Sequence, residues 1–289
     1  MDTVNGNCTY AELLRIETIA LFTVGKKKKL SSIFYRTFLH DRLLTLTFFV
    51  FGMIFVRFPM TGLATFAICR ISLGFFMTFI YAVFYYLNYA SIYSSLAISV
   101  LRVAAVLKPI ESDQLQLQLS RILVLVVYLL PVLTTWFLIP AQAYFTPISN
   151  SASLGIDYEK VYPQWRSSLA MVFVTSITCF LDFSCFAVTI TKWRTLSRKM
   201  TQSNRRSEKS LLFLGCSICL SLCLNCVLQF FFFYMVYLEL SFLIRGFVYD
   251  VLVFVPTWVF YLTHPSFKST SSEDAVSVVS PPKSTKNKY

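Results

Sequence analysis

Four cysteines in the second half of the chain have the spacing of a metal-binding motif. Two residues separate Cys216 from Cys219 and Cys223 from Cys226, and thiolates at such spacing often bind zinc. All four, however, lie within a predominantly apolar run. On a helix they would occupy one stripe about 80° wide, whereas zinc needs a tetrahedron of ligands. We therefore interpret them as small side chains that let a neighbouring helix approach, and we expect no metal site.

Polar side chains within other apolar runs are candidates for binding a small molecule. A carboxylate such as Asp182 is costly in the bilayer core, and it usually faces the bundle interior as a functional or a buried structural residue. Asn225 and Gln229 share a helix face, where they either contact a ligand or form hydrogen bonds between helices. Tyr85 and Tyr89 have the same spacing and either line a pocket or pack against neighbours. These five residues are the candidate ligand-binding set, with packing as the alternative for each.

A second intramembrane carboxylate lies near a basic residue. Asp250 follows Arg245 by five residues in the last apolar run. Charges within membrane segments usually pair with one another. We expect these two side chains to pair near the outer surface.

Several absences in the sequence argue against enzyme chemistry. The chain has only two histidines, His40 and His264, and it contains no GxSxG, HExxH, Walker or GxGxxG motif. We therefore predict that the protein is not an enzyme and that it needs no cofactor.

The composition places these residues in a membrane. Of the 289 residues, 56% are hydrophobic and only 14% are charged, whereas a soluble domain carries roughly a quarter charged residues. A helix needs roughly 20 apolar residues to cross a bilayer. Six runs meet or approach this length, at 43–60, 78–101, 122–144, 169–191, 211–237 and 242–262. The sequence therefore predicts an all-α, multi-pass transmembrane helix bundle with six clear spans.

The distribution of basic residues orients these spans. Twenty Lys and Arg residues lie at 26–42 before the first span, after the second and fourth spans, and in the tail, whereas five lie on the other side. The positive-inside rule assigns the twenty, and with them the C-terminus, to the cytoplasm of a plasma-membrane protein. Because they lie between apolar blocks, the net charge of +12 indicates contact with membrane lipids, above all at loop 192–209, and not with nucleic acid.

The N-terminal segment gives conflicting signals. Asn7 begins a glycosylation sequon, which is used only on the lumenal side, whereas the four lysines at 26–29 belong in the cytoplasm. The sixteen residues at 10–25 carry three charges, which are too many for an ordinary span. Either the N-terminus is cytoplasmic and the sequon is chance, or the chain keeps a remnant of a first helix and Asn7 is a glycosylation site.

Short motifs along residues 30–268 have the order and spacing of a receptor family. They include SSIFYR at 31–36, NYASIY at 88–93, Arg102, and HPSFK at 264–268. This pattern resembles the nematode serpentine chemoreceptors, most closely the gamma class, with a truncated first helix. The resemblance implies a seven-transmembrane G-protein-coupled receptor that senses a small molecule through its helix bundle. It also implies a heterotrimeric G protein as partner, with Arg102 as a coupling residue. The basic loop 192–209 would be a second coupling surface, and contact with anionic lipids is the alternative for that loop.

The chain departs from the family pattern in places. Leu101 stands where the family has Asn before the arginine, no acidic residue precedes Arg102, and loop 145–168 has no cysteine for an outer-loop disulfide. Two alternatives therefore stay open: a small multi-pass transporter or channel subunit, and a truncated receptor isoform that does not signal.

The predicted boundaries divide the chain into three parts. Residues 1–42 form an N-terminal segment with the remnant first helix and a basic cytoplasmic loop, residues 43–264 form the transmembrane bundle, and residues 265–289 form a disordered cytoplasmic tail.

Overall fold

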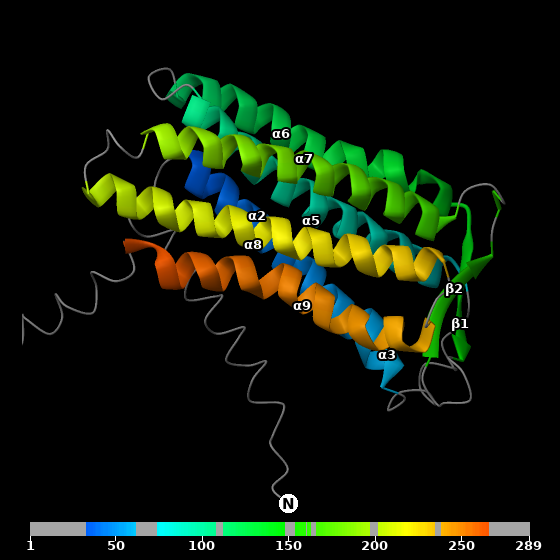
Figure 1. The fold of residues 1–289 in the computed structure, drawn as a ribbon. Helices are drawn as coiled ribbons and strands as arrows, with labels where there is room; N and C mark the ends of the chain where they lie inside the picture. Colours follow the sequence, from blue (N-terminus) through cyan, green and yellow to red (C-terminus); the bar gives the residue numbers. More distant parts are fainter. Residues whose placement is uncertain are drawn as a thin grey trace, which may run out of the picture.

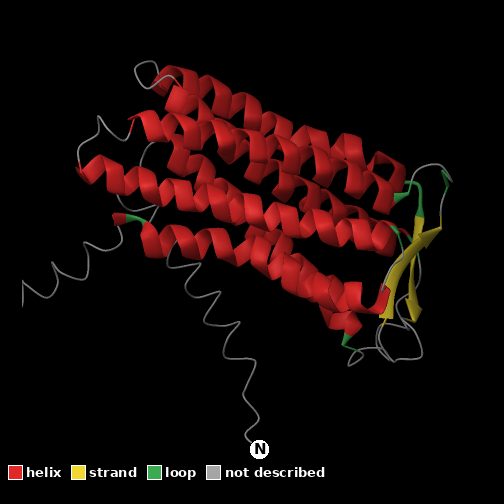
Figure 2. Ribbon diagram, viewed as in Figure 1, coloured by secondary structure: helices red, strands yellow, loops and turns green. Residues whose placement is uncertain are grey.

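The computed structural model is a bundle of long helices with a β-hairpin across one end (Figures 1 and 2). It describes residues 33–61, 74–107, 112–147, 154–159, 161–162, 166–196, 202–234 and 238–265. Within these ranges, six helices are long and apolar enough to cross a membrane, which confirms the predicted multi-pass bundle. Asn7, the remnant first helix and the tail from 266 onward lie outside the described residues.

The first described span is one continuous helix in three segments. Helix α2 covers Ile33–Gly52, a π-helical turn (η2) covers Met53–Arg57, and α3 covers Phe58–Met60. Pro59 has no amide hydrogen, so it cannot donate to the carbonyl four residues before it. The amide of Phe58 donates to the Met53 carbonyl, five residues back, which is the hydrogen bond of a π-helix. The helix begins ten residues before the predicted start of the span at 43.

Helix α5, at Phe75–Leu107, lies at the centre of the bundle. It is about 50 Å long at 1.5 Å per residue, and it packs against α2, α6, α7 and the hairpin. Small buried residues such as Ala90 and Ser91 let neighbouring backbones approach it closely. The other long helices are α6 (Ser112–Thr135), α7 (Ser167–Leu196), α8 (Gln202–Phe233) and α9 (Leu238–Thr263).

The chain between α6 and α7 forms a hairpin that the sequence did not predict. A 3-10 turn (η3) at Trp136–Leu138 ends the helix, and strands β1 (Gln142–Pro147) and β2 (Leu154–Glu159) pair antiparallel, with Gln142 opposite Glu159. The third span, at Gln116–Leu138, is therefore as long as the predicted 122–144 but begins and ends six residues earlier, before Pro140, which cannot continue a helix.

Two side chains hold the hairpin against the bundle, at what we call the hairpin end. Thr78 of α5 donates a hydrogen bond to the Ala141 carbonyl at 2.8 Å and accepts one from the Ala143 amide at 3.1 Å. The Tyr158 ring packs on Tyr81 at 5.4 Å between centroids. The Tyr158 hydroxyl also accepts a hydrogen bond from the first amide of α7 at 2.9 Å.

The outward faces of the helices are apolar, as a lipid environment requires. Phe180 and Phe173 are 71% and 65% exposed, and they lie on the outside of α7. A water-facing surface would not carry so many large apolar side chains in a row. Similar residues on other helices include Leu133, Leu220 and Phe247.

Candidate functional site

A cavity opens at the hairpin end between η2, α3, α5, α9 and strand β2. About 450 Å³ of empty space lies within it, part of which is open solvent at its mouth. Aromatic and aliphatic side chains make most of its wall. The lining residues are Val56, Met60, Tyr81, Phe84, Tyr85, Gly155, Ile156 and Arg245.

Arg245 is the charged residue of this cavity wall. Its guanidinium lies over the rings of Phe84, Phe232 and Tyr249, with 5.3–5.6 Å to the ring centroids. Its Nε donates a hydrogen bond to the Tyr249 hydroxyl at 3.3 Å. These contacts hold the cation by its attraction to the aromatic faces.

Asp250 pairs with Arg57 and not with Arg245, so the predicted Arg245–Asp250 pair is wrong. Arg57 Nη2 lies 2.5 Å from Asp250 Oδ1 and 2.8 Å from the Gly246 carbonyl. Residues five apart on a helix differ by about 140° in direction, so Arg245 and Asp250 face different neighbours. Asp250 faces the end of η2, where Arg57 lies.

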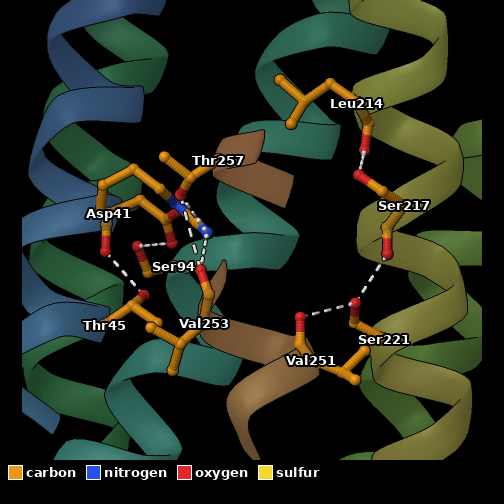
Figure 3. A network of polar contacts seen from close by, with 10 residues as sticks. Asp41, Thr45, Ser94, Leu214, Ser217, Ser221, Val251, Val253 and Thr257 are labelled. Atoms are coloured by element: carbon orange, nitrogen blue, oxygen red, sulfur yellow. Dashed lines mark hydrogen bonds and ion pairs between the residues drawn. The ribbon is translucent and has the colours of Figure 1, made fainter. Parts of the chain in front are cut away.

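A buried ion pair lies deeper in the bundle, next to α5 (Figure 3). Asp41 and Arg42 of α2 pair with each other, and both residues are fully buried. Ser94 of α5 donates to the free carboxylate oxygen of Asp41 at 2.6 Å, and Arg42 Nη1 donates to the Val253 carbonyl of α9 at 3.1 Å. Arg42 therefore belongs to the interior and not, as predicted, to a basic loop at the cytoplasmic surface.

Arg102 lies at the other end of α5, which we call the Arg102 end. It is only 6% exposed, and it pairs with Glu208 of α8, with 3.7 Å to the carboxylate and 3.2 Å to the backbone carbonyl. Its Nε and Nη1 are buried and have no partner among the described residues. The acidic neighbour that the local sequence lacks thus comes from another helix.

His264 follows α9 at the same end and joins three helices. Its Nε2 lies 3.0 Å from the Tyr35 hydroxyl of α2 and 3.3 Å from the Ser207 hydroxyl of α8. Burial lowers the pKa of His264 to about 4, because a buried imidazole is harder to charge. The imidazole is therefore neutral at physiological pH.

Of the five predicted ligand-binding residues, only Tyr85 lines the cavity at the hairpin end. Tyr89 is fully buried in the core cluster one turn further along α5. Asp182 is also fully buried and accepts a hydrogen bond from Ser99, close to Arg102 in the sequence of α5. Gln229 donates to Asn225 at 3.2 Å within α8, so these two amides bond to each other.

Two of the four cysteines in the stripe, Cys223 and Cys226, lie where α7 and α8 meet. Cys223 Sγ of α8 is 3.3 Å from Cys179 Sγ of α7, and Cys226 Sγ is 3.6 Å from the Ser176 hydroxyl. Small side chains therefore let α7 and α8 pack closely, which confirms the structural interpretation. In the described part of the chain, no group of three or more potential ligands could hold a metal ion.

The predicted set omitted Arg245, Arg57 and Glu208. The ionic partners of Arg57 and Glu208 lie on other helices, and so do the Phe84 and Phe232 rings beside Arg245, so local spacing gives no signal for these contacts. The one available signal was the presence of arginines inside apolar runs, because such charges are costly and face the interior.

A known family matches almost the whole chain. The model of the serpentine type 7TM GPCR chemoreceptor Sru family matches residues 9–270. The chain belongs to this family. The match is to Sru and not to the gamma class that the motifs suggested, while the broader prediction of a serpentine chemoreceptor is confirmed. No curated protein matches the chain.

The family match covers the N-terminal segment from residue 9 onward and the whole of α5. The matched range begins before the first described residue, so it includes the segment 10–25. In this Sru-family chain, an open cavity and a buried, partly satisfied arginine lie at opposite ends of the central helix.

Proposed function

We propose that this protein is a chemoreceptor that binds a small molecule in the hairpin-end cavity and activates a heterotrimeric G protein at the Arg102 end. The observation that carries the proposal is the placement of both features on α5. Tyr81 and Tyr85 line the cavity near its start, and Arg102 lies near its end. Family membership supplies the receptor class.

The charge distribution supports the orientation that this function needs. The basic residues gather in the segments that follow the second and fourth predicted spans, at the Arg102 end. We infer that this end faces the cytoplasm with the C-terminal tail, and that the cavity opens outside the plasma membrane. With residues 10–25 as a first passage there would be seven passages, and Asn7 would be glycosylated.

The Arg102–Glu208 pair is suited to serve as a switch. It joins α5 to α8, and it leaves two buried nitrogen donors of Arg102 without partners in the described part. An unpaired buried donor is costly. A helix packing that turns Arg102 towards acceptors on a G protein would give these donors hydrogen-bond partners. A ligand would favour that packing by binding it more tightly than the resting one.

A series of polar contacts gives a physical route between the two ends. Near the cavity, Tyr249 accepts from Arg245 and from the Asn88 amide at 3.2 Å. Further along α5, Ser94 bonds to Asp41, and Ser99 bonds to Asp182. We assign Asp182, Tyr89, Asn225 and Gln229 to this interior and keep Tyr85 as a ligand contact, since coupling travels through packed and hydrogen-bonded neighbours.

The direct test uses purified receptor in lipid nanodiscs with a panel of G-protein heterotrimers. The receptor should speed the exchange of GDP for a non-hydrolysable GTP analogue on at least one heterotrimer. Arg102→Gln should abolish this effect, whereas Arg121→Gln should not, because Arg121 is an exposed basic residue on α6. Transport of a solute by the purified chain, without any exchange activity, would favour the transporter alternative and contradict the proposal.

A further inference from the structure

We propose that the hairpin-end cavity selects an anion, specifically a small carboxylate with an apolar or aromatic body. This inference rests on the proposed function, because it names the class of ligand for the same cavity. It is carried by the charge balance of the arginines in the bundle and by the chemistry of the cavity wall.

Among the described residues, four arginines are shielded from the surroundings. Three of them lie within 4.0 Å of a carboxylate: Arg42 pairs with Asp41, Arg57 with Asp250, and Arg102 with Glu208. The fourth, Arg245, has no carboxylate within that distance in the described ranges. It is also the one that lines the cavity.

Arg245 keeps most of its hydrogen-bonding capacity for a ligand. A guanidinium has five N–H donors, and the one hydrogen bond that Arg245 makes to the described residues is from Nε to the Tyr249 hydroxyl. Its terminal nitrogens are not among the fully enclosed unpaired atoms of the described residues, and the Arg245 side chain is part of the cavity wall. A carboxylate can accept from such a fork with two parallel hydrogen bonds.

The groups around Arg245 determine which sign of charge the cavity favours in a ligand. Asp250, five residues further along α9, is already paired with Arg57, and the cavity wall has no acidic residue among those that the structure describes. An amine would therefore meet one positive charge and, in the described wall, no negative one. An anion would compensate Arg245 in a setting of low dielectric constant, where such attraction is strong.

The rest of the wall selects the body of the ligand. Tyr81, Phe84 and Tyr85 present aromatic rings, and Val56 and Ile156 add aliphatic surface. Such a wall excludes water from an apolar group and stacks well with a ring. The limited space favours a molecule with few heavy atoms beyond the carboxylate and its ring.

The test compares phenylacetate with phenylacetamide, which has the same shape and no charge, on receptor in phosphatidylcholine nanodiscs by saturation-transfer NMR titration. Phenylacetate should bind about tenfold more tightly or better, because a charge-assisted bidentate contact is lost in the amide. Arg245→Gln should remove this preference, and Arg245→Lys should keep part of it. Arg166→Gln should leave it unchanged, because Arg166 is an exposed arginine at the same end and does not line the cavity.

Three results would overturn the inference: equal affinity for the two probes, a preference that persists in Arg245→Gln, or no binding of phenylacetate. Binding in nanodiscs needs no G protein, so these results would leave receptor coupling to its own exchange assay. Selective phenylacetate binding without nucleotide exchange on any heterotrimer would instead contradict the proposed function alone.

Discussion

The carboxylate of Asp41 and the guanidinium of Arg42 are adjacent in the chain and pair with each other in the interior, with side chains 0% and 1% exposed. The pair also bonds to Ser94 of α5 and to the Val253 carbonyl of α9. It therefore ties three helices at mid-bundle, as Figure 3 shows for Asp41, Ser94 and Val253. A buried pair of this kind is costly to break from one side, because the other charge is left uncompensated.

Removing one partner should destabilise the bundle more than removing both. Asp41→Asn leaves the Arg42 charge without its carboxylate, and we expect a loss of about 3–5 kcal/mol of folding free energy. The double variant Asp41→Asn/Arg42→Met should recover most of that loss. The measurement is thermal unfolding in detergent, with exposed Glu159→Gln on the hairpin as control. If Asp41→Asn and the double variant lose the same folding free energy, the ion pair does not bind the helices together.

A double-mutant cycle should find coupling between Arg57 and Asp250. Their side chains are 23% and 18% exposed, so solvent weakens the interaction, and we expect a coupling energy of about 1 kcal/mol. The matched cycle between Arg245 and Asp250 should give a value near zero. The reverse pattern would restore the pairing that the sequence suggested and would refute the arrangement of η2 against α9.

Mild oxidation should cross-link α7 to α8. Cys179 and Cys223 have their sulfur atoms 3.3 Å apart, so copper phenanthroline, which enters membranes, should join them. In a background with Cys8 and Cys69 changed to Ser, mass spectrometry of proteolytic fragments should detect this link. Cys216→Ser should not affect it, because Cys216 is exposed on the outer side. A link that survives Cys223→Ser would contradict the packing of the two helices.

Acidification should destabilise the fold through His264. Its pKa is about 4 in the folded protein and about 6.5 when unfolded, so between these values the unfolded chain binds a proton that the folded chain does not. The free energy of unfolding should therefore fall as the pH falls from about 6.5 to about 4. In thermal unfolding between these pH values, His264→Gln should reduce the slope of the free energy of unfolding against pH. The control His40→Gln should leave that slope unchanged. An unchanged slope in His264→Gln would mean that His264 is not the group responsible.

Much of the architecture could be predicted from the sequence because membrane spans follow from local hydropathy. The spans and the close approach at Cys223 depend on runs of residues along one helix, and those predictions were confirmed. The hairpin at Gln142–Pro147 and Leu154–Glu159 could not be predicted, because an outer loop has no apolar periodicity that its fold must satisfy.

The charged contacts could not be predicted for a different reason. Asp250 was assigned to Arg245 because the two are close in sequence, whereas its partner Arg57 is 193 residues away. Glu208 lies 106 residues from Arg102 and was not connected with it. Arg42 was counted as a surface residue, although its neighbour Asp41 neutralises it and permits burial. Only the packing of helices decides between such partners.

We propose that the Arg102–Glu208 pair holds the receptor in its resting packing, and nucleotide exchange with Glu208→Gln is the experiment for this role. Loss of the carboxylate removes the charge partner of Arg102 in the resting packing. Basal exchange on the responsive heterotrimer, measured without ligand, should rise about fivefold or more, as a shift of about 1 kcal/mol implies. Glu159→Gln at the opposite end should leave basal exchange at the wild-type rate. Unchanged or lower exchange in Glu208→Gln, with the protein folded and G protein present, would show that the Arg102–Glu208 pair does not hold the receptor at rest.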